Sequence, residues 1–398
     1  MMEWKEVRLG DVCTRVCSGG TPKSTNLSYY GGEIPWLNTK EIDFNRIYST
    51  EKTITDSGLN NSSAKWIVPN TVTVAMYGAT AGKSCIVKVP MTTNQACCNL
   101  TINDEVADYE FVYYTLKNDY TTLASLANGG AQQNLNAQII KDYVLKMPSL
   151  ADQRRIASIL SSLDRKIELN NKINADLEEM AQAIFKNWFV DFEPFKDGKF
   201  VDSELGMIPE GWKVGTIGDI VEFQNGFTFS SKDFSENGEY KIITIKSVQD
   251  GCLVTEGSSK VTEYPTKMPA YCKLQSGDIL LSLTGNVGRC CLVTETNLLL
   301  NQRVAKIKAK ECYDNSFSYA LFRLKETKEL LISISRGTAQ ANLSPVEASK
   351  LPMVIPSEDA RKSFSMISDS IMNKIISIHI ENSRLSLLRD TLLPRLMS

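Results

Sequence analysis

Apolar positions recur at helical spacing in two stretches of the chain, and the second stretch follows the first by 208 residues. Steps of three and four residues are typical of a coiled-coil seam. The first seam contains Leu160, Leu163, Ile167, Asn170, Asn174, Leu177, Ala181 and Ile184. The second seam is weaker and contains Ser368, Ile371, Ile375, Ile378, Asn382, Leu385, Arg389 and Leu392. We expect two long helices that pack against each other along these positions.

Both helices have a clear predicted beginning. Ser149 and Ser357 each follow a proline, and a serine hydroxyl can accept a hydrogen bond from a first-turn N–H group. A helix from Ser149 to about Asn187 is roughly 55 Å long at 1.5 Å per residue. Because a whole domain separates the two seams, we expect them to pack antiparallel, with one domain at each end of the helix pair.

An asparagine interrupts each seam at the same register, Asn174 in the first and Asn382 in the second. A buried asparagine costs stability but can fix the register and the partner face of a coiled coil. The alternative is a looser seam in which both asparagines face solvent. The sequence leaves both interpretations open.

The remainder of the chain is a tandem repeat of short β-rich runs and glycine-rich turns. Trp4-Lys5 recurs as Trp212-Lys213, and Asn94-Gln95 recurs as Asn301-Gln302. The fold prediction is mixed α/β, with two similar domains, two long antiparallel helices and pseudo-two-fold internal symmetry. The predicted boundaries are 1–148 and 212–356 for the two domains, 149–190 and 357–398 for the helices, and 191–211 for a linker.

Composition argues against several classes of protein. No apolar run approaches the roughly 20 residues needed to span a bilayer, and the amino terminus is charged, so we expect a cytoplasmic protein without membrane contact. The ten cysteines form no CxxC pair, and His379 is the only histidine. Zinc sites and histidine-based catalysis are therefore disfavoured. We interpret the cysteines as reduced and mostly buried.

Basic side chains gather at matching places in the two repeats, although the net charge is −2. The stretch 266–310 has seven Lys and Arg residues against two acidic ones, and the stretch 64–103 has three lysines and no acid. A surplus of Lys and Arg is what contact with phosphates requires. One such stretch could be a chance fluctuation, but two at equivalent positions favour nucleic-acid binding.

Motifs that would carry catalysis are incomplete. The sequence from Gly78 to Ser84 resembles a phosphate-binding loop but is one residue short, and the second repeat lacks it, so we predict a strand-to-strand turn. Glu326-Thr327-Lys328 has the ExK pattern of nucleases, without a metal-binding aspartate suitably placed before it. No two prolines are adjacent, which excludes the Pro-Pro motif of amino-methyltransferases. We expect no catalytic or metal-binding residue in this chain.

The sequence 183–195, AIFKNWFVDFEPF, followed by SELGMIPEGW at 203–212, resembles the central conserved region of specificity subunits of type I restriction-modification enzymes. The resemblance covers the whole chain. It implies a non-catalytic subunit whose two target-recognition domains each read half of a split site in double-stranded DNA. It also implies docking of two methyltransferase subunits, which restriction subunits can join. S-adenosylmethionine, ATP and Mg would be bound by those partners and none of them by this chain.

Comparison of the two repeats suggests which residues would contact DNA. Charge is kept between Lys40 and Lys246 and between Lys83 and Arg289, so we predict phosphate contacts there. Residues that differ are predicted to read bases: Asn38 against Thr244, Thr80 against Asn286, and Gln133 against Ala341. The predicted DNA surface also includes Tyr77, Gln132, Asn134, Thr284, Gln340 and Asn342.

Two further positions leave alternatives open. Arg303 corresponds to Ala96, so it either reads guanine in the second half-site only or is an ordinary surface arginine. Asn94-Gln95 and Asn301-Gln302 are identical in both repeats, and we predict that they stabilise turns.

Two other classes of function compete with DNA recognition. An autonomous enzyme with a cryptic active site would methylate or cut DNA when purified alone. An adaptor that recruits partners through its coiled coil would bind every DNA duplex only weakly, even at low salt.

Overall fold

The computed structural model describes residues 4–128, 134–337 and 341–398, which form two compact units. The first unit contains the residues up to Lys166 together with Leu385–Ser398, and the second contains Ile167–Arg384. Each unit therefore includes one repeat and parts of both long helices.

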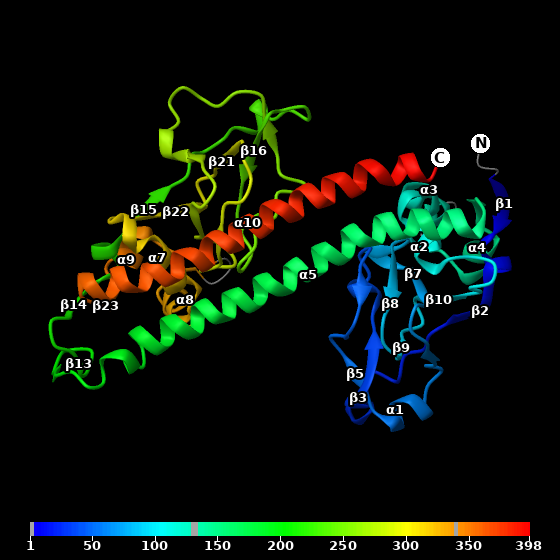
Figure 1. Cartoon of the computed structure of the whole chain (residues 1–398), viewed down its shortest axis with the longest axis horizontal. Helices are drawn as coiled ribbons and strands as arrows, with labels where there is room; N and C mark the ends of the chain where they lie inside the picture. Colours follow the sequence, from blue (N-terminus) through cyan, green and yellow to red (C-terminus); the bar gives the residue numbers. More distant parts are fainter. Residues whose placement is uncertain (1–3, 129–133, 338–340) are drawn as a thin grey trace. The chain divides into compact units, whose positions relative to one another are not determined.

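The first unit contains two main sheets and a small strand pair (Figure 1). One sheet has the order β2-β10-β7-β8-β4, with strands Cys13–Ser18, Cys97–Ile102, Val72–Ala75, Ser84–Val87 and Arg46–Ile47. The other has the order β5-β3-β9-β6, with strands Thr53–Ile54, Tyr30–Leu37, Met91–Thr93 and Trp66–Ile67. In that sheet β3 and β9 are parallel. The small pair joins β1 (Lys5–Arg8) to β11 (Val144–Met147).

The second unit repeats this topology, except that its first sheet has no counterpart of β4. One sheet has the order β15-β22-β19-β20, with strands Val221–Asn225, Val304–Ala309, Ile279–Ser282 and Cys290–Leu292. The other has the order β17-β16-β21-β18, with strands Lys260–Val261, Tyr240–Ile243, Leu298–Leu300 and Lys273–Leu274, and β16 and β21 are parallel. The small pair joins β14 (Lys213–Thr216) to β23 (Pro352–Ile355). The internal repeat predicted from the sequence is thus present in the fold.

Short helices complete each core. In the first unit these are α1 (Asp56–Asn60), α2 (Tyr109–Asn118), α3 (Tyr120–Ser125) and α4 (Ala137–Asp142). In the second they are α6 (Ile217–Ile220), α7 (Asn315–Arg323), α8 (Lys325–Ser333) and α9 (Pro345–Ser349). Helix α2 begins where Asp108 accepts a hydrogen bond from the Phe111 N–H group at 2.9 Å. Its aromatic side chains, such as Phe111, belong to the same buried cluster as Val72 and Val74 of β7.

The predicted strand-to-strand turn is confirmed. Residues 76–83 connect β7 to β8, which pair antiparallel, and the equivalent turn connects β19 to β20. Glu326 and Lys328 lie on helix α8, where Lys328 forms an ion pair with Asp250.

Two long helices begin where the sequence predicts. Helix α5 spans Leu150–Phe189 and helix α10 spans Glu358–Leu396. The Ser149 hydroxyl accepts from the Asp152 N–H group at 3.2 Å, and the Ser357 hydroxyl from Ala360 at 3.3 Å. Both predicted N-caps are confirmed.

Within each unit the two helices contact each other. In the first unit Arg389 Nη1 lies 2.8 Å from Asp164 Oδ1. In the second unit the Asn170 amide bonds to Asn382 and the Phe185 ring lies 5.8 Å from Phe364. In that unit, as residue numbers rise along α5 they fall along α10, so the two helices run in opposite directions. None of the predicted seam positions is fully exposed.

Asn174 and Asn382 share a register position, but they do not form a hydrogen bond with each other. Asn382 pairs with Asn170, at 2.8 Å, rather than with Asn174. Asn174 is only 5% exposed, and neither of its amide atoms has a hydrogen-bond partner among the described residues. The solvent-facing alternative is therefore wrong for Asn174.

The predicted linker is folded. It contains the antiparallel pair β12 (Phe200–Val201) and β13 (Ile208–Pro209). The Trp212 ring packs against Phe192 and Phe195, with centroids 5.5 and 4.9 Å away. Aromatic packing therefore fixes the chain as it leaves α5.

Candidate DNA interface

The candidate residues of each domain meet at the carboxyl ends of a parallel strand pair. Strands β3 and β9 end at the paired residues Leu37 and Thr93, and strands β16 and β21 end at Ile243 and Leu300. The next residues are Asn38 and Asn94 in the first domain. Asn94 N–H donates to the Leu37 carbonyl at 3.0 Å, which places the two chain segments side by side.

The second domain repeats this geometry with different side chains. Thr244 and Asn301 follow the strand ends, and Asn301 N–H donates to the Ile243 carbonyl at 3.1 Å. The same backbone edge thus presents Asn38 in one domain and Thr244 in the other.

These two residues also shape the turn that follows. The Asn38 amide oxygen accepts from the Lys40 N–H group at 3.3 Å, while the Glu41 carboxylate accepts from Asn38 N–H at 3.0 Å. The Thr244 hydroxyl accepts from Lys246 N–H at 3.4 Å. The amide nitrogen of Asn38 makes no hydrogen bond among the described residues. It therefore remains available as a donor.

The turn between β7 and β8 joins the same surface. The Thr80 hydroxyl donates to the Thr39 carbonyl at 2.9 Å, so Thr80 lies beside Asn38 and Lys40. Leu135 N–H donates to the Met76 carbonyl at 3.0 Å, which places Asn134 near Tyr77.

In the second domain the predicted side chains contact one another. The Thr284 hydroxyl donates to the Asn342 amide oxygen at 3.0 Å. The Asn286 amide lies 3.3 Å from the Arg289 guanidinium. The predicted residues Gln132, Gln133 and Gln340 lie outside the described residues.

The predicted phosphate-binding cations of the two domains differ in whether a carboxylate lies beside them. Lys40 Nζ lies 2.5 Å from Glu51, and Lys83 Nζ lies 2.5 Å from Asp43. The Lys40 ammonium, through its hydrogen bond and charge, lowers the pKa of the Glu51 carboxyl. The charges of Lys40 and Lys83 are therefore partly neutralised by neighbouring carboxylates.

The second domain leaves more of its charge free. Arg289 donates to the Gln249 amide oxygen, and Gln249 donates in turn to the Lys246 carbonyl at 2.8 Å. Within the described part of the chain, Lys246 and Arg303 form no ion pair. Free cations at this edge can approach phosphates without first giving up a carboxylate.

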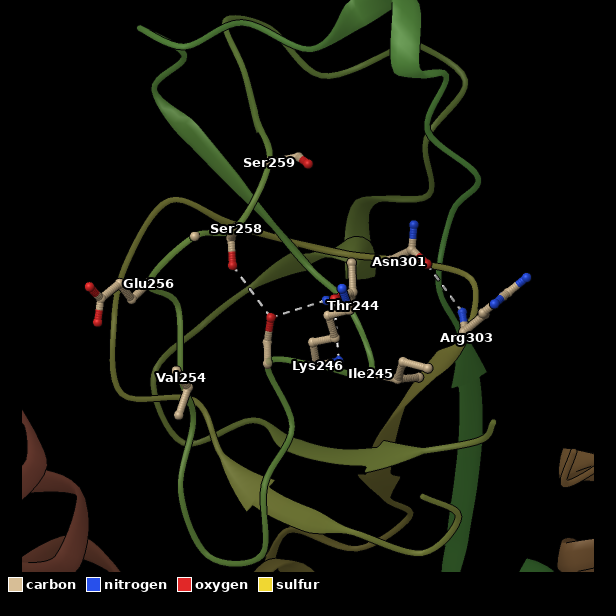
Figure 2. A pocket seen from close by; sticks show the side chains of 11 residues that line it. Thr244, Ile245, Lys246, Val254, Glu256, Ser258, Ser259, Asn301 and Arg303 are labelled. Atoms are coloured by element: carbon tan, nitrogen blue, oxygen red, sulfur yellow. Dashed lines mark hydrogen bonds between the residues drawn. The ribbon is translucent and has the colours of Figure 1, made fainter. Parts of the chain in front are cut away.

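A cavity adjoins the edge in each domain. The first has a volume of about 560 Å³ and is lined by Thr21, Tyr30, Trp36, Asn38 and Glu51 among others. The second has about 420 Å³, and its lining includes Thr244, Lys246, Glu256, Asn301 and Arg303. Figure 2 shows Arg303 at the rim, with its guanidinium directed away from Thr244.

Arg303 also lines a neighbouring cavity of about 680 Å³, together with Thr284, Gln302 and Asn342. Arg303 therefore lies beside Thr244 and Lys246 in one cavity, and it lies beside Thr284 and Asn342 in the other. The matching position in the first domain is Ala96, which carries no charge.

Each domain contains a hydrogen-bonded threonine and glutamine pair that the comparison of the two repeats does not predict. Thr21 donates from its hydroxyl to the Gln95 amide oxygen, and Thr228 donates to Gln302 in the same way. The signal in the sequence is the identical Asn-Gln dipeptide of each repeat, for which the sequence predicts only a turn-stabilising role. That assignment is confirmed for the asparagines: Asn94 accepts from Ala96 N–H at 3.1 Å and Asn301 from Arg303 N–H at 3.4 Å.

Residues that could hold a metal do not converge in the described structure. No group of three or more His, Cys, Asp or Glu side chains in residues 4–128, 134–337 and 341–398 is arranged to bind an ion. Six of the ten cysteines are buried, and burial raises the pKa of the Cys13 and Cys98 thiols to about 12. Burial lowers the pKa of His379, which lies on helix α10. No helix in the same ranges is long and apolar enough to cross a membrane.

The two domains have the same backbone edge with different polar side chains, which is the architecture of a duplicated recognition module. Comparison with known proteins identifies the family as one of DNA recognition. Residues 1–179 and 209–385 match the family described as "Type I restriction modification DNA specificity domain". The chain belongs to this family, and it is a DNA-recognition subunit rather than an enzyme.

Relatives match over nearly the whole chain. The type I restriction enzyme MjaIX specificity subunit of Methanocaldococcus jannaschii is 29% identical, over 99% of this chain and 93% of the relative. The HindI specificity subunit of Haemophilus influenzae is 23% identical, over 100% of this chain and 99% of the relative. The crystal structure of an S subunit from M. genitalium has a TM-score of 0.57 and 18% identity, and covers 99% of this chain and 96% of its own. That structure shares the fold.

Proposed function

We propose that this chain reads a two-part DNA site, one half with each domain, and positions partner subunits on it. The observation that carries the proposal is the equivalent edge of the two domains. The backbone there is the same, with parallel strands ending at Leu37 and Ile243, while the side chains that follow differ. A shared backbone with different side chains is what two docking sites for different base sequences require.

The first half-site would be read by Asn38 and Thr80, which lie together at the edge. The second would be read by Thr244, Asn286 and Arg303. An arginine can donate two hydrogen bonds to guanine in the major groove, while asparagine and threonine favour adenine and thymine contacts. The two half-sites are therefore expected to differ in sequence.

The two long helices would form an antiparallel coiled coil that fixes the gap between the half-sites. Its core would contain Leu160, Leu163, Ile167, Asn174, Leu177 and Ile184 of α5 and Ile371, Ile375, Ile378, Asn382, Leu385 and Leu392 of α10. A rod of fixed length determines how many unread base pairs separate two docked domains. This role is supported by the helix contacts at Arg389 and Asn382.

The chemistry would come from partners. Two methyltransferase subunits that bind S-adenosylmethionine would dock on this chain, and two ATP-dependent and Mg-dependent restriction subunits could join them. Such a complex would act on DNA in the cytoplasm. This chain would supply recognition and would bind none of these cofactors.

The test is a map of adenine methylation in the parent cell with and without the gene for this chain. We expect one split motif, with two unequal specific halves, to lose its methylation when the gene is deleted. A methylation pattern that does not change would contradict the proposal.

Two competing functions predict different results. An autonomous enzyme would methylate or cut DNA when the chain is purified alone, whereas we expect neither reaction. A DNA-free adaptor would bind a mixed-sequence duplex no better than an unrelated acidic protein at low salt, whereas we expect measurable, salt-dependent binding.

A further inference from the structure

The identical Asn-Gln dipeptides divide their work between the two side chains. Asn94 and Asn301 each accept a hydrogen bond from the N–H group two residues later, which holds the turn. The glutamines take no part in that turn. Their amide oxygens instead accept from Thr21 and Thr228, which lie 74 residues earlier in each domain.

The segment that carries the threonine packs closely against the dipeptide in both domains. Gly20 N–H donates to the Thr93 carbonyl at 2.9 Å, and Phe227 N–H donates to the Leu300 carbonyl at 2.9 Å. A Cβ atom on Gly19 would lie 2.1 Å from the Thr93 carbonyl oxygen, and one on Gly226 would lie 2.2 Å from that of Asn301. Only glycine permits this approach. The geometry of the threonine and glutamine pair is therefore built into both domains.

In both domains the amide oxygen of the glutamine faces the threonine hydroxyl. Since the hydroxyl group occupies the amide oxygen, the amide nitrogen is the end left to interact with a ligand. Both glutamines are exposed, and neither amide nitrogen donates a hydrogen bond within the described part of the chain. Each domain thus presents two oriented N–H donors that the fold itself does not use.

We propose that Gln95 and Gln302 donate hydrogen bonds to DNA phosphate oxygens at equivalent positions of the two half-sites. The proposal rests on the proposed function and names residues of the same surface. The neighbouring residues differ between the domains, with Ala96 in one and Arg303 in the other, while the glutamines are identical. The component that two different half-sites share is the sugar-phosphate backbone. Donors without a free acceptor suit an anionic oxygen, and such bonds are stronger than bonds between neutral groups.

These contacts would set the orientation of each domain on the duplex without reading sequence. They complement the cations, because Lys40 and Lys83 are each paired with a carboxylate in the first domain. A neutral donor releases no counterion, so it contributes affinity that does not decline with salt in the way that lysine contacts do.

The test uses Gln95→Glu and Gln302→Glu in the full chain. Glutamate keeps an oxygen for the threonine hydroxyl, removes the N–H donors and adds a charge that repels phosphate. We expect unchanged melting temperatures and a Kd for a fluorescent mixed-sequence duplex that rises about tenfold or more for each variant. Gln275→Glu is the matched control, because it adds the same charge to an exposed residue just after β18, which pairs with the opposite end of β21. We expect it to bind as the wild type does.

A second variant guards against an effect of charge or folding. Gln95→Met keeps the length of the side chain without donors, and we expect it to weaken binding while the methylated motif stays the same. Wild-type affinity in the methionine and glutamate variants would overturn the inference, as would a motif altered at one base or a lowered melting temperature that accounts for the loss. If the wild-type chain itself fails to bind duplex DNA, the proposed function fails instead.

Discussion

Asn170 donates an amide hydrogen bond to the Asn382 amide oxygen at 2.8 Å, and Asn382 donates in return to Asn171 at 2.8 Å. The repeat offset of 208 residues relates Asn170 to Ile378 and Asn382 to Asn174. The pair equivalent to Asn170 and Asn382 is therefore Ile378 and Asn174, in which one amide has been lost. Isoleucine has no side-chain hydrogen-bonding group, and the buried Asn174 amide has no hydrogen-bond partner among the described residues.

The two asparagines of α5 should respond in opposite ways to leucine. Asn170→Leu removes the donor to Asn382 and should lower the free energy of unfolding by about 1–3 kcal/mol. Asn174→Leu removes an unsatisfied buried amide and should raise it by about 1–2 kcal/mol. Chemical denaturation of both variants measures the difference. A similar loss of unfolding free energy in both variants would contradict the expected difference between the bonded Asn170 and the unbonded Asn174.

The free and paired lysines should contribute unequally to DNA affinity. Lys246→Ala removes an unpaired cation and should reduce the slope of log K against log salt by about one. Lys40→Ala should have a smaller effect, because Glu51 already neutralises much of its charge. Binding titrations at several salt concentrations provide the comparison, with Glu51→Gln expected to strengthen binding by releasing Lys40. Equal slopes for the two alanine variants would contradict the assignment.

Arg303 should specify one base of the second half-site. Arg303→Ala is expected to relax the methylated motif at a single guanine position, because a bidentate arginine contact discriminates by about 1–3 kcal/mol. The first half of the motif should stay unchanged. Methylation mapping of the variant checks both expectations, and Lys308→Ala serves as a control for the loss of an exposed cation. A motif that is unchanged in both halves would make Arg303 an ordinary surface residue.

His379 should make stability depend on pH in a predictable direction. Burial lowers its pKa in the folded protein below the usual value of 6.5, so the unfolded chain binds the proton more readily. The free energy of unfolding should therefore fall as the pH drops through about 6.5. His379→Gln should remove this contribution. Denaturation at about pH 7.5 and pH 5.5 tests it, and an identical pH dependence in wild type and variant would contradict the expectation.

The repeat could be predicted from the sequence because the same backbone geometry demands the same glycines and the same turn residues. The long helices could be predicted as well, since apolar spacing and the capping serines Ser149 and Ser357 mark them directly. These are local signals that need no knowledge of distant contacts.

The missed features depend on contacts between distant residues. The pairing of Asn382 with Asn170 follows from how two antiparallel helices meet, which register within one helix does not determine. The separation of Gln95 from its turn depends on Thr21, which approaches only when the domain has folded. Likewise, the neutralisation of Lys83 by Asp43 joins residues 40 positions apart.

The central claim, that two long helices set the gap between two half-sites, is tested most directly by lengthening both helices. Four added residues extend an α-helix by about 6 Å and rotate its end by roughly 40° beyond a full turn. One base pair adds about 3.4 Å and roughly 35° of twist, so the unread gap should grow by one or two base pairs.

The measurement is a methylation map after four residues are inserted beside Asn170 and beside Asn382, with the same insertion between β12 and β13 as the control. We predict a longer gap between unchanged half-sites for the double helix insertion, and the original gap for the control. The original gap in both would contradict the account.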